Sequence, residues 1–453
     1  MKRIGVFEGF CGQMLGIIAC LALSLFFSGC RCESETPQSR LVLEEAAEPA
    51  DPPPLRWPDS RRCRRLGEGA SQRLPLPPEL SGSPTELGSA VPWGQGWALP
   101  LLVPGEESRV YVAGLVKTDW TLFELGLVYG QTEAPQLLGL SDGWVAMKLS
   151  SDAGNLEMQF ARLDGQGADA QLVWGASLLQ GRDVSLATSL ALGPKKDEFL
   201  VVWDEPRLGS ARSRVAGRRV SLDGLVALGN TLDLGAVSQD SDQPRIFQRK
   251  GGYWLTYLVY EKLPDRRSAH DQGLVSEAPA SIWGVKLDKN GQALTEPLSL
   301  SGMPESILTY DAEVDTQGRL VVAWRQPQLG LDGQEMHLRL ASLDEGGAQQ
   351  SFHFFEVDFD AGAPEVLSRG EELEVYLGSK QAGLYRLRWH QGPGELIWEP
   401  EFHRGQPLWS TEVPATGAVR GNGAARVIVA RPEGLSSRLE ELVCQDSAAE
   451  GPG

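Results

Sequence analysis

Residues 199–235 read FLVVWDEPRLGSARSRVAGRRVSLDGLVALGNTLDLG, and two features of this stretch recur along the chain. The first is a short apolar run that follows a turn containing Gly or Asp. Such runs are rich in Val, Leu, Trp and Tyr and are too short for buried helices, which is typical of central β-strands. Their starts lie roughly 50 to 60 residues apart. The seven runs are GWALPLLV (96–103), DGWVAMKLS (142–150), DEFLVVWDEP (197–206), GGYWLTYLVYE (251–261), GRLVVAWRQP (318–327), EELEVYLGS (371–379) and NGAARVIVA (422–430).

The second feature is a strand that ends in Leu-Asp and then turns through Gly. Asp accepts local backbone hydrogen bonds and Gly adopts positive φ, so this pattern predicts a hairpin turn. Pro also precedes several apolar runs, where its missing N–H is tolerated at a sheet edge. The Leu-Asp turns are ARLDGQG (161–167), VSLDG (220–224), VKLDKNG (285–291) and ASLDEGG (341–347), with WHQGPG (389–394) in the same place of a sixth unit; the Pro segments are QPRI (243–246), APEV (363–366) and VPAT (413–416).

The repeated unit therefore contains a strand, the apolar central strand, a loop, a third strand, the Leu-Asp turn and a fourth strand. Repetition of such a unit predicts an all-β fold, a β-propeller of about seven four-stranded blades. Six or eight blades are the next alternatives, because the first and sixth units are irregular. Two or three separate β-sandwiches are a further alternative, but they do not predict the repeated turn. No segment has a sustained helical period, so we expect almost no helices.

The unit in residues 199–235 resembles the β-propeller repeats of secreted and lipid-anchored proteins from myxobacteria and related bacteria. The likeness consists of a Val-Val-Trp strand, a polar loop and the sequence Arg-Val-Ser-x-Asp-Gly. That family is mostly of unknown function. The resemblance therefore implies a propeller fold and a place in the cell envelope, and nothing about activity.

The first 29 residues are expected to be a signal peptide. Lys2 and Arg3 precede an apolar run from Met14 to Phe27, which is shorter than a membrane span and suits the apolar region of a secretory signal. The following Phe-Ser-Gly-Cys resembles the lipobox of bacterial lipoproteins. This resemblance implies cleavage between Gly29 and Cys30, acylation of Cys30 with chains such as palmitate, and anchoring to a membrane. The alternative is an ordinary secretory signal with an incidental cysteine.

The resemblance to lipoproteins also implies a location. Arg31 follows the lipidated cysteine in place of the Asp that retains lipoproteins in the inner membrane, so we expect the outer membrane of the bacterial cell envelope. Residues 30–62 are acidic and rich in Pro, which predicts a disordered tether. Residues 63–453 are then the propeller, with a short disordered tail at the C-terminus.

The charge of the chain limits its partners. Lys and Arg number 42 and Asp and Glu number 60, so the net charge is −18. A phosphate backbone would be repelled, which excludes nucleic acid as an expected partner. We expect a monomer that contacts the membrane through its lipid and offers the propeller to a protein or glycan ligand.

Two of the six cysteines flank the predicted propeller. Cys63 lies at its start and Cys444 ends the segment SRLEELVC (437–444), a strand with no hairpin after it. Its outer partner must come from elsewhere, and RLPLP (73–77) is the spare strand nearest Cys63. An antiparallel pairing there would bring the two cysteines together, and an exported protein can keep the resulting disulfide. The alternative is that Cys63 pairs with Cys32.

Motifs for chemistry are weak in this sequence. The five histidines form no metal-binding pattern, and no phosphate-binding loop or nucleophile elbow occurs. The segment from Ser150 to Gly154 matches half of an Asp-box and is expected to be a turn. Asp358 and Asp360 suggest a calcium loop but lack the remaining ligands. We therefore assign no catalytic residue and expect no cofactor and no metal.

The best candidate for a binding site is the loop KLPDRRSAHDQGLVSEAPAS (262–281). Loops between the second and third strands of each blade share one face, and a long loop in a compact fold is more often functional than not. Trp203 and Trp324 are expected to pack between blades, with a sugar-stacking platform as the alternative. The loop residues named as candidates are Arg266, Arg267, His270 and Asp271.

Two functions are considered. The leading hypothesis is a non-catalytic binding or scaffolding module, held out from the membrane by the tether. The rival is an enzyme of the glycosidase or lyase class acting on extracellular polysaccharide, which needs two carboxylates near the propeller axis. Asp204, Glu205 and Glu261 are the acids considered for that role, although no sequence signature pairs them.

Overall fold

The computed structural model describes the blades of the protein and leaves the N-terminal segment aside. For the strands nearest the N-terminus and for all residues after 388, the backbone alone is described. The described residues are 63–65, 86–94, 96–104, 108–116, 119–128, 134–152, 155–165, 170–182, 187–207, 212–235, 240–260, 279–302, 305–330, 333–347, 349–358, 361–369, 372–379, 383–391, 396–404, 416–420, 424–433 and 436–445.

Within these residues the strands form seven antiparallel sheets, here called blades 1 to 7, and no helix. Blade 1 contains β2 (Glu86–Leu87), β3 (Val91–Trp93), β4 (Gly96–Val103), β5 (Ser108–Val116) and β6 (Asp119–Val128); blade 2 contains β7 (Gln136–Gly139), β8 (Gly143–Asp152), β9 (Asn155–Asp164), β10 (Gln171–Trp174) and β11 (Leu179–Arg182); blade 3 contains β12 (Thr188–Leu192), β13 (Glu198–Pro206), β14 (Ser213–Ser221) and β15 (Ala227–Asp233).

The remaining blades have four strands each. Blade 4 contains β16 (Asp240–Arg249), β17 (Gly252–Tyr260), β18 (Ala280–Asp288) and β19 (Leu298–Ser299); blade 5 contains β20 (Thr309–Val314), β21 (Leu320–Gly330), β22 (Gly333–Leu343) and β23 (Gln349–Val357); blade 6 contains β24 (Glu365–Arg369), β25 (Glu372–Ser379), β26 (Gly383–Gln391) and β27 (Leu396–Arg404); blade 7 contains β28 (Thr416–Arg420), β29 (Ala424–Glu433), β30 (Ser436–Gln445) and β1 (Cys63–Arg65).

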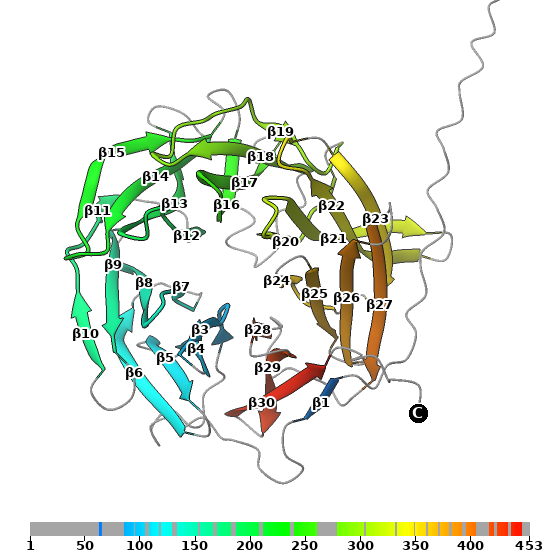
Figure 1. Cartoon of the computed structure of the whole chain (residues 1–453), viewed down its shortest axis with the longest axis horizontal. Helices are drawn as coiled ribbons and strands as arrows, with labels where there is room; N and C mark the ends of the chain where they lie inside the picture. Colours follow the sequence, from blue (N-terminus) through cyan, green and yellow to red (C-terminus); the bar gives the residue numbers. More distant parts are fainter. Residues whose placement is uncertain are drawn as a thin grey trace, which may run out of the picture. The chain divides into compact units, whose positions relative to one another are not determined.

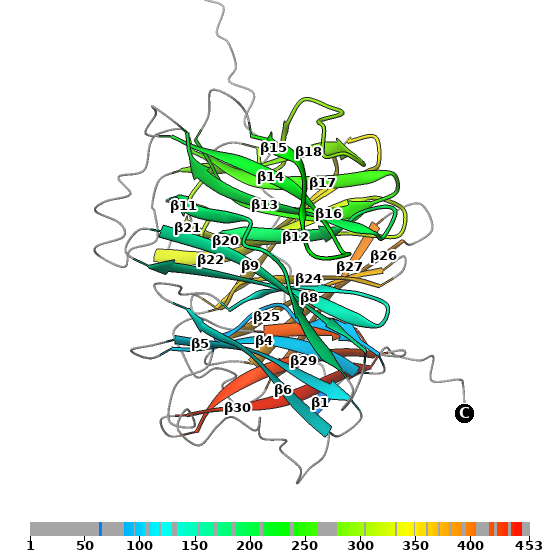
Figure 2. The same ribbon diagram turned by 90° about the vertical axis from the view of Figure 1, so that its left-hand side faces the viewer.

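The blades are arranged in a closed ring. The inner strands β3, β7, β12, β16, β20, β24 and β28 each contact the next, and β28 contacts β3 (Figure 1). In the side view the blades follow one another as separate layers, and blade 7 lies beside blade 1 (Figure 2). This arrangement confirms the predicted propeller and the number of blades, except that blades 1 and 2 carry a fifth strand.

The apolar runs identified in the sequence are the second strands of the seven blades. They correspond to β4, β8, β13, β17, β21, β25 and β29. Among the described residues, buried apolar side chains form five clusters. Each cluster fills the space between two consecutive blades, from blades 1 and 2 to blades 5 and 6. Trp203 and Trp324 are both 0% exposed and belong to two of these clusters, which confirms packing between blades and not a sugar platform.

The Leu-Asp turns also form as predicted, between the third and fourth strands of their blades. In blade 4, Asp288 Oδ1 accepts hydrogen bonds from the backbone N–H groups of Asn290 and Gln292, each at 2.8 Å. Gly291 adopts a φ of 81° there, and a Cβ at that position would lie 2.6 Å from Leu232 Cδ1. Gly is therefore required both for the turn and for the close approach of blade 3.

One of the Pro segments was interpreted wrongly. Pro244 does not precede a strand but lies inside β16, where the register between β16 and β17 shifts between Asp242 and Arg245. The missing N–H is harmless there because bulged residues do not join the ladder. Pro364 does precede β24, as expected, and Pro414 is outside the described residues.

The ring closes in blade 7, where the last strand β30 pairs with the first strand β1 (Figure 1). The prediction that an N-terminal strand completes this blade is confirmed, but the strand is Cys63–Arg65 and not 73–77, which is outside the described residues. Cys63 lies directly opposite Cys444 in the register. The cysteine side chains are not described, so the disulfide stays a prediction.

Candidate functional site

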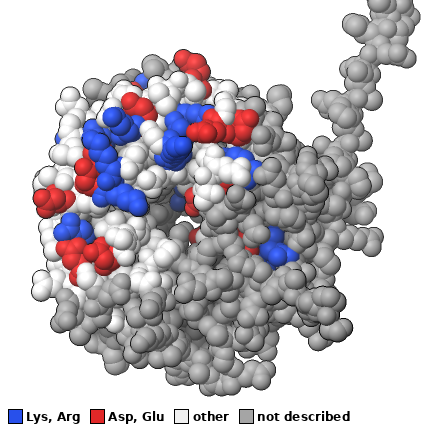
Figure 3. Space-filling view, in the orientation of Figure 1, with Lys and Arg blue, Asp and Glu red and all other residues white. Residues whose placement is uncertain are grey.

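Polar side chains gather where the inner strands of blades 4, 5 and 6 meet. In β20, half-buried Asp311 and Glu313 alternate with buried Tyr310, Ala312 and Val314, so the two carboxylates point away from the apolar cluster. Half-buried Arg245 comes from β16 and half-buried Glu365 begins β24. We call Arg245, Asp311, Glu313 and Glu365 the axial site. The space-filling view shows a hollow at the centre of the ring with acidic atoms visible inside it (Figure 3).

Hydrogen bonds hold two of these carboxylates to residues of other blades. The backbone N–H of Val366 donates to Asp311 Oδ2 at 2.8 Å, which ties β20 to β24. The Ser89 hydroxyl, which precedes β3, donates to Glu365 Oε2 at 3.4 Å. Residues far apart in the sequence therefore meet here only because the ring is closed.

Burial raises the pKa of Asp311 and raises that of Glu365 further, because desolvation disfavours the charged form. The charge of Asp311 adds to the rise at Glu365, so the two carboxyls titrate together. The positive charge of Arg245 opposes the shift at both. The axial site thus holds neighbouring carboxyl groups whose pKa values are raised by burial, beside the positive charge of Arg245.

Glu313 is the third carboxyl of the axial site. Burial raises its pKa to about 7, with a smaller contribution from the charge of Asp311. The backbone N–H of Val314 donates to Glu313 Oε1 at 2.8 Å and partly offsets the rise. Glu313 therefore changes its charge within the physiological pH range.

Stability is expected to fall as the pH rises through this range. A carboxyl with a raised folded-state pKa contributes stability that is complete below its unfolded pKa and lost as the pH passes the folded one. Denaturant unfolding at pH 8 should therefore give a free energy about 1–3 kcal/mol below that at pH 5. Glu313→Gln should flatten this dependence, whereas the exposed Asp142→Asn should not. An equal slope in both variants would contradict the assignment.

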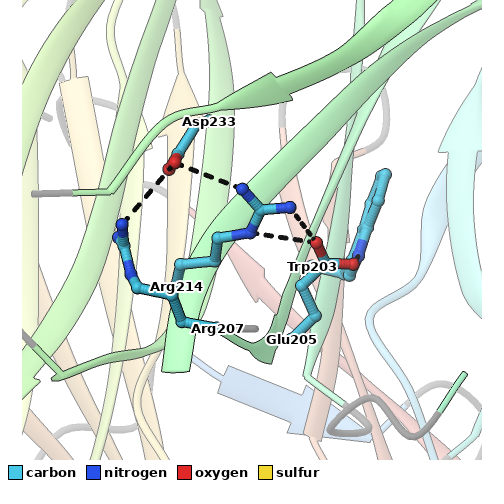
Figure 4. Close-up of polar contacts among 5 residues, drawn as sticks. All are labelled: Trp203, Glu205, Arg207, Arg214 and Asp233. Carbon is cyan, nitrogen blue, oxygen red and sulfur yellow. Dashed lines mark hydrogen bonds and ion pairs between the residues drawn. The ribbon is translucent and has the colours of Figure 1, made fainter. Parts of the chain in front are cut away.

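The acids considered from the sequence have other roles. Glu205 is buried in blade 3, where its Oε2 accepts from Trp203 Nε1 at 3.0 Å and its Oε1 accepts from Arg214 Nη2 at 2.5 Å (Figure 4). Arg214 Nη1 also donates to Asp233 Oδ2 at 3.2 Å, and Arg207 lies 3.8 Å from the same oxygen. Both carboxylate oxygens of Glu205 are thus occupied by structural contacts.

These acids were considered only as residues that could converge near the axis, and the structure describes two of them, Asp204 and Glu205. Asp204 is 0% exposed in blade 3, next to Glu205, and Glu261 is outside the described residues. The acids that do face the axis were missed in the sequence. Their signal in the sequence is the alternation of polar and apolar residues in TYDAEV (309–314).

The other predicted site residues are not located by the structure. Arg266, Arg267, His270 and Asp271 lie outside the described residues, although Ala280 and Ser281 at the end of that segment belong to β18. Gly29 and Cys30 lie outside them as well.

Two further features concern the described part of the chain alone. No group of three or more His, Cys, Asp or Glu side chains in it is arranged to hold a metal ion. None of its segments is a helix long and apolar enough to cross a membrane.

Ser150 and Asp152 end β8, and Asp152 pairs with Asn155 in a hairpin, as expected for a turn.

The face of the propeller drawn in Figure 3 carries both basic and acidic side chains. On the face drawn in Figure 3, Lys and Arg side chains gather in an arc at the upper left, over blade 3, with Asp and Glu around them. Trp174 of β10 is 45% exposed, and Lys148 Nζ lies 5.1 Å from the centroid of its ring. This exposed tryptophan was also missed in the sequence.

The chain is similar to several solved structures, each at low sequence identity. The β-propeller domain of the trilobed protease from Pyrococcus furiosus is 11% identical, with a TM-score of 0.43 over 81% of this chain and 99% of that chain. The α-L-arabinanase of Penicillium chrysogenum is 12% identical, with a TM-score of 0.41 over 83% and 95%. The sialidase of Trypanosoma rangeli is 14% identical, with a TM-score of 0.35 over 62% and 49%.

At such identities no activity transfers to this chain. No family model matches it, and no curated protein is similar to it in sequence. The function must therefore be argued from the axial site.

Proposed function

We propose that the protein is a lipoprotein of the bacterial cell envelope whose propeller is a non-catalytic binding module for protein or glycan. Lipid on Cys30 would hold it at the outer membrane, and the acidic residues 30–62 would act as a tether. The propeller would act as a monomer and present the axial site to its ligand. The lipid anchor is tested by metabolic labelling with a fatty-acid analogue, which Cys30→Ala should abolish.

The observation that supports a binding role is the axial site. Asp311, Glu313 and Glu365 are held in a desolvated position that raises the pKa of all three, and carboxyl groups with such raised pKa values are typical of functional sites. Polar groups that converge in a hollow are the usual mark of a ligand site.

The chemistry of the site indicates what the ligand must offer. Carboxylates accept hydrogen bonds, so the ligand needs donors: the hydroxyl groups of a glycan, or the ammonium and guanidinium groups of a partner protein. Arg245 adds one donor of its own, which would bind an acceptor on the same ligand. A nucleic acid offers mainly anionic phosphate and is disfavoured by the net charge of −18.

The test combines a glycan array with capture of partners from envelope extracts, using the whole mature chain. Asp311→Asn and Glu365→Gln should each weaken binding about ten- to a hundredfold, because a hydrogen bond to a charged group is lost. Asp142→Asn makes the same charge change on an exposed turn and should bind like the wild type. Equal binding by all three variants, or no ligand in either assay, would reject the axial site as the binding site.

A second candidate is a glycoside hydrolase acting on extracellular polysaccharide. The feature that favours it is the effect of one carboxyl on the other, because the charge of Asp311 raises the pKa of Glu365 and glycosidases pair a protonated acid with a carboxylate. Release of reducing sugars from a panel of polysaccharides tests it. Activity that Asp311→Asn abolishes without loss of binding would favour the enzyme, and binding without release would favour the binding module.

A further inference from the structure

The inner strand β16 contains one residue more than its partner β17 over the same length. Asp242 is paired with Leu258, but the next pair is Arg245 with Thr256, so Gln243 and Pro244 stand opposite a single residue. This is a β-bulge. Gln243 adopts a φ of 49°, a conformation that residues with a side chain rarely take.

The bulge decides which way Arg245 faces. Residues directly paired across two strands share a face of the sheet, so Arg245 shares the face of Thr256 and Leu258. Leu258 belongs to the apolar cluster between blades 4 and 5, so this face is turned toward β20. Ile246, paired with Leu255, belongs to the cluster on the opposite side, between blades 3 and 4. Without the extra residue Arg245 would take that opposite face, because a shift of one residue exchanges the two faces of a strand.

Tyr310 of β20 contacts the bulge directly. Its hydroxyl donates to the backbone oxygen of Gln243 at 2.5 Å and accepts from Thr256 Oγ1 at 3.4 Å. The side chain is 2% exposed, and burial raises the pKa of the hydroxyl, so it stays protonated and remains a donor. The neighbouring backbone is also fixed by Asp242, whose Oδ1 accepts from the N–H of Gln243 at 2.7 Å.

We propose that Tyr310 is a positioning residue of the axial site: its hydroxyl holds the β16 bulge in the form that turns Arg245 toward Asp311 and Glu365. Arg245 then supplies a positive charge that lowers the pKa of both carboxyls and so opposes the effect of burial. The proposal rests on the proposed function only in taking the axial site as the place where the ligand binds. It adds that Tyr310 influences the pKa values of the axial carboxyls through the position of Arg245, without needing to touch the ligand.

The first test removes the hydroxyl alone. Tyr310→Phe should raise the pKa of Asp311 and Glu365 by about one unit, as Arg245→Gln should, when the carboxyl carbons are titrated by NMR. Tyr385→Phe is the matched control. Tyr385 is 6% exposed on β26, the third strand of blade 6, and its hydroxyl accepts from the backbone N–H of Asp358 at 3.2 Å, so this variant also loses a hydrogen bond of a buried tyrosine. It should lower stability without moving the titrations of the axial site.

The second test acts on the bulge and leaves Tyr310 in place. Gln243 is half-buried, so both variants should fold. Gln243→Gly suits the positive φ and should leave both pKa values unchanged, whereas Gln243→Val disfavours that φ and should raise them as Tyr310→Phe does. The proposal is overturned if Arg245→Gln moves the titrations and neither Tyr310→Phe nor Gln243→Val does. These readouts need no ligand, so a failed binding assay would reject the proposed function and leave this inference standing.

Discussion

Cys444→Ser is expected to lower the free energy of unfolding of the oxidised protein by about 2–5 kcal/mol, the usual cost of losing a native disulfide. Cys63 and Cys444 are paired directly across β1 and β30, and opposed residues of antiparallel strands have Cα atoms about 4.5–5.5 Å apart. That separation is within the range a disulfide spans. We propose this bond as a covalent closure of blade 7, formed when a disulfide-donating oxidant outside the cytoplasm accepts the two electrons and two protons of the thiols.

Substitutions of the other cysteines provide the controls for this prediction. Cys63→Ser should cost as much as Cys444→Ser, and the double variant should cost no more than either, because all three lose one bond. Cys32→Ser should leave stability unchanged. Peptide mapping without reductant should recover a Cys63–Cys444 peptide, and recovery of a Cys32–Cys63 peptide would show that the closure is wrong.

Trp203→Ala is expected to cost about 3–5 kcal/mol of stability, measured by denaturant unfolding. The indole is 0% exposed between blades 2 and 3, among side chains such as Phe160 and Phe199. Its removal leaves a cavity and also takes away the donor to Glu205 Oε2 (Figure 4). A buried carboxylate that loses a donor adds to the cost of the cavity.

Trp174→Ala is the matched control, because the same side chain is removed from a position that is 45% exposed. It should cost less than about 1 kcal/mol. If Trp203→Ala lowered the free energy of unfolding as little as Trp174→Ala, apolar packing between the blades would not be a main source of stability.

The fold could be predicted in detail because its central strands are fully buried and stand between turns with clear chemistry. An apolar run such as FLVVW can be satisfied only inside a sheet that is covered on both faces, and the Leu-Asp turn fixes where the next strand begins. The closure at blade 7 could also be predicted, since SRLEELVC (437–444) has no hairpin after it. Which N-terminal segment pairs with it depends on tertiary contacts: the described partner is Cys63–Arg65, whereas 73–77 lies outside the described residues.

The axial site could not be predicted in the same way. Asp311, Glu365 and Arg245 come from three blades, and no local spacing relates them. The direction of Arg245 also depends on a single extra residue in β16, which exchanges the faces of the strand. Acids next to apolar strands, such as Glu205, were easier to see in the sequence and proved to be structural.

The pairing of β1 with β30 has a consequence for the order of events during biosynthesis. The strand that leaves the ribosome before any other described strand finds its partner only when the final described strand has been made, so the ring cannot be completed while these strands are still being synthesised. Contacts between such distant parts of a chain form slowly. Until then the edge of β1 that pairs with β30 is open to neighbouring chains, and we expect the hazard of misassembly to be concentrated in that interval.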